Sequence, residues 1–147
     1  MPSFGPRSKA QLATCDPRLV RLFERVIEIV DCAVIEGARG KIAQAEAVAQ
    51  GRSKAPWPES KHNVPIKISG RSPAEWPEDP AGLSRAADVA PYPIDWNNRR
   101  RFDHFAGVVR GVAAELKIPI RWGGDGSRDF DPTNETFHDL PHFELDD

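Results

Sequence analysis

The chain contains only four histidines, and two of them have neighbours that could support catalysis. His62 follows a serine and a lysine in an irregular region, and His142 lies near the C-terminal end of the sequence. Between them, Asp88 interrupts an otherwise apolar segment, where a buried carboxylate without a partner would be costly. Two imidazoles and one carboxylate suffice for a catalytic zinc ion that keeps its fourth position for water. These residue types indicate a candidate metal site, although ligands spread so widely along the chain do not form a motif.

Such a site also needs a second carboxylate that does not bind the metal. A zinc ion polarises a carbonyl and lowers the pKa of its bound water to about 7, and the second carboxylate must then take up the proton that this water releases. Asp139 lies three residues before His142 and could reach the site, and Pro141 would stiffen this approach. His138 is a rival as ligand or base, whereas His104 falls within a predicted helix and is expected at its surface.

The elements that must position these residues follow from the periodicity of apolar side chains. Helices are predicted at 16–30 with Asp16 as N-cap, at 41–50, and at 96–117 with Asp95 as N-cap. Short strands are predicted at 32–35, 84–92, 119–122 and 142–145. This mixture predicts an α+β fold, with a small, mostly antiparallel sheet and helices packed on one side of it.

Length and composition exclude several classes of protein. A chain of 147 residues is enough for one domain. Its 20 basic and 22 acidic side chains argue against a protein that mainly coats nucleic acid. No apolar run has the length of a membrane span, and the first residues lack the apolar segment of a signal peptide, so we expect synthesis in the cytosol. The two cysteines, Cys15 and Cys32, cannot build a disulfide framework and are expected to be buried.

Several short segments carry more specific patterns, and they occur at 17–23, 34–39, 60–62, 86–88, 121–125 and 139–145. In this order they resemble the zinc L-alanyl-D-glutamate endopeptidases of phage endolysins. That family belongs to the wider D-alanyl-D-alanine carboxypeptidase and hedgehog-like fold group. The similarity extends over nearly the whole chain, and the last two segments together are fairly specific. The resemblance therefore implies a hedgehog-like or D-Ala-D-Ala-peptidase-like fold.

The resemblance also implies roles for individual residues. It makes His62, Asp88 and His142 the ligands of a Zn²⁺ ion, and it makes Asp139 the general base that activates the metal-bound water.

Three further residues acquire roles in the same way. The resemblance implies that Arg39 is catalytic and stabilises the developing oxyanion or holds a substrate carbonyl, a contribution on the order of 3 kcal/mol. It implies that Ser60 and Gln44 bind and position the substrate.

One segment departs from the family pattern, because 25 residues separate His62 from Asp88 and Ser84 replaces the usual glycine. Lengthening this connection from about six to about 25 residues costs roughly 1.3 kcal/mol in loop-closure entropy. A zinc site contributing about 10 kcal/mol tolerates this cost. The inserted residues 63–83 are irregular and rich in proline and tryptophan, so we hypothesise that they form a flap over the substrate groove.

The expected function is that of an endolysin, a single zinc peptidase domain over residues 1–147. It would cleave the L-Ala–D-Glu amide of peptidoglycan stem peptides by metal-activated water. We expect a monomer that binds no nucleic acid, does not insert stably into a membrane, is made in the host cytoplasm and acts on the cell wall or periplasm after release. Two alternatives stay open: a D-Ala-D-Ala carboxypeptidase, and a non-catalytic module that binds wall peptides through a broken metal site.

The acidic stretch 125–131 is a possible calcium site, but its spacing does not fit an EF-hand loop. We therefore expect a solvated acidic loop.

Overall fold

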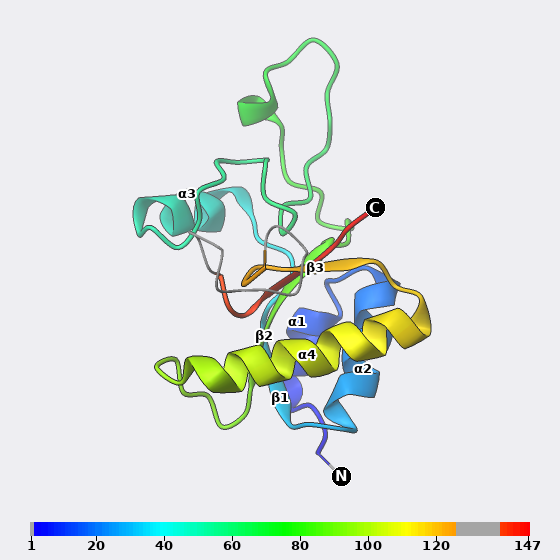
Figure 1. Cartoon of the computed structure of the whole chain (residues 1–147). Coiled ribbons are helices and arrows are strands. Elements are labelled where there is room, and N and C mark those ends of the chain that lie inside the picture. Colours follow the sequence, from blue (N-terminus) through cyan, green and yellow to red (C-terminus); the bar gives the residue numbers. More distant parts are fainter. Residues whose placement is uncertain (1, 126–138) are drawn as a thin grey trace.

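The computed structural model describes residues 2–125 and 139–147, which form an antiparallel four-stranded sheet and four α-helices (Figure 1). The helices are α1 (Pro6–Leu12), α2 (Pro17–Ile27), α3 (Lys41–Ala49) and α4 (Arg99–Leu116), with a short 3-10 turn, η1 (Pro73–Glu75). The strands are β1 (Cys32–Glu36), β2 (Ala86–Pro91), β3 (Ile120–Trp122) and β4 (His142–Leu145). The predicted α+β fold is confirmed, and α1, α2 and α4 lie together on one side of the sheet.

The sheet has the order β1-β2-β4-β3, which places β2 and the C-terminal strand β4 side by side at its centre. In β2 and β4, Ala87 lies opposite Phe143 and Asp88 lies opposite His142. Because successive side chains of a strand point to opposite faces, one face carries the apolar members of these pairs and the other carries the polar ones. Phe143 packs edge-on against Phe23 of α2 and Phe105 of α4, at centroid distances of 5.6 and 6.0 Å.

Helix α2 begins where the sequence predicts. The Asp16 side chain accepts a hydrogen bond of 2.9 Å from the backbone of Arg18, and Pro17 occupies the first helical turn. The helix ends at Ile27, earlier than predicted, because residues 28–31 form the turn that leads into β1.

Two helix starts differ from the prediction. Helix α4 begins at Arg99 after Asn98, not after Asp95. Asp95 stabilises the preceding turn instead, since its carboxylate accepts a hydrogen bond from the backbone of Asn97 at 3.1 Å. Helix α1 was not predicted, and the Ser8 hydroxyl attaches it to β1 by accepting a hydrogen bond from the Val34 amide at 3.0 Å.

Residues 63–83 form a hairpin-like arm that extends away from the sheet (Figure 1). Backbone hydrogen bonds join Ile66 to Pro77 and Asp79 to Val64, both at 2.8 Å. At the base of the arm the indole of Trp57, which is buried, donates a hydrogen bond of 2.9 Å to the carbonyl of Trp76. The arm is therefore attached through its base, and its tip has few contacts with the rest of the chain.

Candidate metal centre and groove

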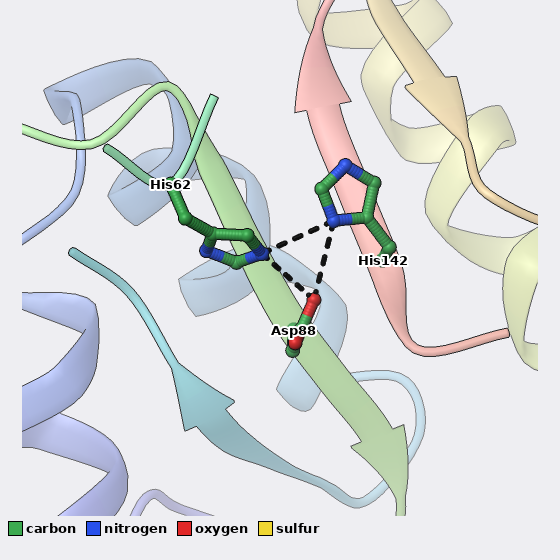
Figure 2. A group of neighbouring side chains, drawn as sticks. All are labelled: His62, Asp88 and His142. Atoms are coloured by element: carbon green, nitrogen blue, oxygen red, sulfur yellow. Dashed lines mark hydrogen bonds and ion pairs between the residues drawn. The ribbon is translucent and has the colours of Figure 1, made fainter. Parts of the chain in front are cut away.

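His62, Asp88 and His142 converge on one point above the sheet (Figure 2). His62 Nε2 lies 3.0 Å from Asp88 Oδ1 and 3.1 Å from His142 Nδ1, and His142 Nδ1 lies 3.3 Å from the same Asp88 oxygen. The last two residues are direct neighbours across β2 and β4, whereas His62 arrives from the loop before the arm. The structure thus brings together three candidate ligands that the sequence separates widely.

The hydrogen bonds of the outer ring nitrogens determine which nitrogens carry lone pairs toward this point. His62 Nδ1 donates to the carbonyl of Gly37 at 2.7 Å, which leaves the lone pair on Nε2. His142 Nε2 donates to the Glu144 carboxylate at 2.9 Å, which leaves the lone pair on Nδ1. Two imidazole lone pairs and a carboxylate oxygen therefore face one another, and this group could hold a metal ion. The donor set fits a zinc ion, since two histidines and one carboxylate are a common catalytic combination.

The electrostatics of the site agree with this arrangement. Burial alone would raise the pKa of the Asp88 carboxyl, but its interactions with His142 and His62 outweigh burial and lower the pKa. Burial alone would lower the pKa of His142, but its hydrogen bonds with Asp88 and Glu144 outweigh that effect and raise the pKa to about 9.

Glu144 and Lys61 belong to the site, although the sequence analysis gave them no role. Glu144 accepts from His142, and its other oxygen lies 3.1 Å from Lys61 Nζ. Burial would raise the pKa of Glu144, but the hydrogen bonds from His142 and Lys61 lower it to about 2. The alternation of β4 was a usable signal, because residues two apart on a strand share a face.

Arg39 lies beside the cluster and is almost completely buried. Its guanidinium binds both oxygens of Glu36, at 2.9 and 2.8 Å, and lies 3.6 Å from Asp88 Oδ2. Burial would lower its pKa, but the Glu36 carboxylate outweighs burial and raises it. A fixed, charged donor group therefore stands next to the candidate metal site.

The structure places Gln44 behind Arg39, fully buried. Its side-chain oxygen accepts from Arg39 at 3.1 Å and from Asn63 at 3.0 Å, and its nitrogen donates to Ser53 Oγ at 3.0 Å and to the carbonyl of Ala55 at 2.6 Å. All of its polar atoms are engaged, so Gln44 supports the neighbouring loop. Ser60, by contrast, lines the groove above the cluster.

Asp139 also lies at this point, with Oδ2 4.0 Å from His142 Nδ1. Burial, followed by the negative charge of Asp88, raises the pKa of its carboxyl. A carboxyl with a raised pKa next to a metal site is suited to accept and return a proton near neutral pH.

The cluster opens into a groove of about 540 Å³. One wall comes from residues 52–62, and the opposite wall comes from Arg121, Gly123, Asp139, His142 and Glu144. Residues 63–83 are described throughout, yet the residues lining this groove include none of them. The cavity lining therefore does not support the flap hypothesis, and the segment that borders the groove is the one before His62.

The remaining sequence candidates lie elsewhere or are not described. His104 is exposed on α4, as predicted. His138 and most of the acidic stretch 125–131 lie outside the described residues. The exception is Asp125, which is fully buried and paired with Arg110 at 2.8 Å, so the expectation of a solvated loop is wrong at this residue.

Comparisons with known proteins agree on one family. The family model described as phage L-alanyl-D-glutamate peptidase matches residues 2–146. The chain is 31% identical to an L-alanyl-D-glutamate peptidase of Escherichia phage T5, over 97% of this chain and 96% of that protein. It also matches the crystal structure of the L-Ala D-Glu endopeptidase ChiX of Serratia marcescens, with a TM-score of 0.65, 26% identity, and coverage of 98% of this chain and 90% of that chain. Among the residues that the structure describes, no helix is long and apolar enough to cross a membrane.

Proposed function

Because this chain belongs to the phage L-alanyl-D-glutamate peptidase family and is a peptidoglycan-cleaving endopeptidase, we propose that it works as a zinc enzyme. The zinc ligands are His62 Nε2, Asp88 Oδ1 and His142 Nδ1. The observation that supports this most strongly is the convergence of these three atoms with their lone pairs directed at one point. The bond cleaved is the amide between L-Ala and D-Glu of the peptidoglycan stem peptide.

A zinc ion held by these atoms supplies Lewis acidity toward the scissile carbonyl and toward the attacking water. Asp139 takes a proton from that water as the new carbon–oxygen bond forms. The protonated acid then gives the proton to the departing D-Glu nitrogen as the carbon–nitrogen bond breaks. Its position 4.0 Å from His142 and its raised pKa support both halves of this role.

Arg39 holds the negative charge that develops on the scissile carbonyl oxygen, or holds a neighbouring substrate carbonyl. Its bidentate bond with Glu36 fixes the guanidinium before the substrate arrives, and such preorganisation contributes on the order of 3 kcal/mol. Ser60 contributes a hydroxyl to substrate binding from the groove wall. Gln44 acts indirectly, by holding Arg39 and the loop at 53–55 in place.

Residues 1–147 act together as one zinc peptidase domain with the arm as an insertion. The chain acts as a monomer, a state supported by the fact that its own residues line both walls of the groove. We place its action at the cell wall, where the substrate lies, after synthesis in the host cytoplasm and release.

Paired substitutions test the proposal. His142→Ala should lose both bound zinc and wall cleavage, whereas Asp139→Ala should keep zinc and lose cleavage by about 10²–10⁴-fold. Zinc content is measured by atomic emission, and the products are identified by mass analysis of digested muropeptides. Products that lack only a terminal D-Ala would show a carboxypeptidase instead. A folded, wall-binding protein with less than about a tenth of an equivalent of zinc would show a non-catalytic binding module.

A further inference from the structure

Arg121 stands out among the cations that line the groove. Arg39 is bound to Glu36, Lys61 to Glu144, and Arg52 to the side chain of Gln50 at 2.8 Å. Within residues 2–125 and 139–147, Arg121 makes no side-chain hydrogen bond or ion pair, although it lines the groove and is only partly exposed. Its charge is therefore available to a ligand.

The sheet register places Arg121 close to the catalytic cluster. Arg121 of β3 lies directly opposite Glu144 of β4, which is two residues from His142. Directly opposite residues of an antiparallel pair share a face, with Cβ atoms about 4.5–5.5 Å apart. Arg121 therefore stands on the same face of the sheet as the candidate metal ligands, while its neighbour Trp122 is buried in the other direction.

No carboxyl group among the described residues that line the groove forms an ion pair with Arg121. Asp139, Glu144 and Glu59 line the same groove, and each brings a carboxyl group. The carboxylate of Glu144 is already engaged by His142 and Lys61, so it does not neutralise Arg121. The groove thus offers a guanidinium that has no carboxylate partner among the described residues, and a ligand carboxylate would supply one at this place.

The substrate carries such a carboxylate next to the scissile bond. D-Glu has two carboxyl groups, and the stem peptide uses only one of them to bond to its next residue. The residue on the leaving side of the L-Ala–D-Glu bond therefore keeps a free carboxylate unless it is amidated. A guanidinium can bind a carboxylate through two parallel hydrogen bonds, which fixes position as well as charge.

We propose that Arg121 binds the free carboxylate of the D-Glu residue and makes the enzyme selective for an acidic residue after the scissile bond. The proposal rests on the proposed function, and it assigns Arg121 to substrate recognition and not to the chemical step. An enzyme with this contact should discriminate against stem peptides in which that carboxylate is a carboxamide.

The test uses two synthetic stem peptides that differ only in this group, D-Glu with a free carboxylate and the same residue as its amide. The wild-type protein should cleave the carboxylate peptide with a kcat/KM roughly 10–100-fold higher, the range expected for a charge-assisted hydrogen-bonded pair. Arg121→Gln should lose this factor on the carboxylate peptide, mostly through KM, and should change little on the amide. Arg121→Lys should recover part of the preference, and zinc content should stay constant.

Arg25→Gln is the matched control, because it removes the same charge from an exposed position of α2 outside the groove lining. It should alter cleavage of either peptide by less than about twofold. Equal losses on both peptides in Arg121→Gln, or a preference that survives the substitution, would overturn the inference.

Failure of the proposed function would look different, because the wild-type protein would then cleave neither peptide. In that case calorimetric binding of the two peptides to Asp139→Asn, with and without Arg121→Gln, still decides the role of Arg121. Tighter binding of the carboxylate peptide that depends on Arg121 supports the inference, and equal binding of both peptides refutes it.

Discussion

The two faces of the central sheet differ sharply in what they carry, although the same strands supply both. On β4, Phe143 and Leu145 are fully buried against α2 and α4, while His142 and Glu144 face the groove. Adjacent residues of one short strand thus serve the core and the site. The core face fixes the strand, and the strand fixes the geometry of the groove face.

This division explains how so small a protein can build a candidate metal site without disulfides. The residues His142 and Asp88 are oriented by strand pairing and need no dedicated loop. A shift of one residue in the pairing would exchange the two faces completely. Both faces therefore require the same register, and substitutions on each face should have different consequences.

The largest effect on stability is expected on the core face, from Phe143→Ala. Removing a fully buried ring that contacts Phe23 and Phe105 should lower the free energy of unfolding by about 3–5 kcal/mol. Urea unfolding of the zinc-free protein measures this loss. Arg121→Gln, on the groove face of the same sheet, serves as control and should change stability by less than about 0.5 kcal/mol. Comparable losses in both variants would contradict the division between the faces.

A smaller effect is expected on the groove face from Glu144→Ala. The variant removes the acceptor that keeps the proton on His142 Nε2, so zinc affinity should fall about 10–100-fold. Competition with a chelator measures the affinity. Glu144→Gln retains an oxygen acceptor and should recover part of the loss. Unchanged affinity in Glu144→Ala would show that this carboxylate does not orient the ligand.

Much of the fold could be predicted from the sequence, because apolar periodicity records which side of each element is buried. The buried stripe of α2 from Leu19 to Ile27 and the alternation of β4 are local signals. Helix α1 gave no such signal, since only seven residues form it and its attachment depends on a hydrogen bond between Ser8 and distant Val34.

The candidate ligands could be named from the sequence only through family resemblance. Nothing local indicates that His62 meets Asp88, because the arm separates them along the chain and only the tertiary fold brings them together. The same limit applies to buried Asp125, whose partner Arg110 lies on α4. Residues that depend on tertiary partners, such as Gln44 behind Arg39, receive their role from the fold and not from their neighbours in sequence.

Burial on the core face of the sheet should also keep a thiol protonated, and Cys32 at the start of β1 tests this. Burial, followed by the charge of Asp31, raises the pKa of its thiol to about 12. Above about pH 9 the unfolded thiol loses its proton while the folded one keeps it, so stability falls as pH rises. Between pH 9 and 10 this residue should account for a loss of about 1 kcal/mol.

The measurement is the free energy of unfolding at both pH values for the wild-type protein and for Cys32→Ala. The variant is less stable at each pH because it removes a buried group, but its decline with pH should be shallower by about that amount. Parallel declines would show that the thiol is not protected from ionisation by the core.

The smallest effect is expected beyond the sheet, at the tip of the arm. Replacing residues 69–75 with Asn-Gly keeps the indole of Trp76 near the carbonyl of Ile68, which it binds at 3.0 Å. The arm lines no part of the groove, so wall cleavage should stay within about twofold of wild type. Gln44→Ala is the informative counterpart, because it releases the groove wall at 53–55 and should lower cleavage well beyond twofold. A tenfold loss of cleavage on shortening the arm would instead indicate that the arm takes part in binding the cell wall. The substrate-binding groove would then extend beyond the face of the sheet.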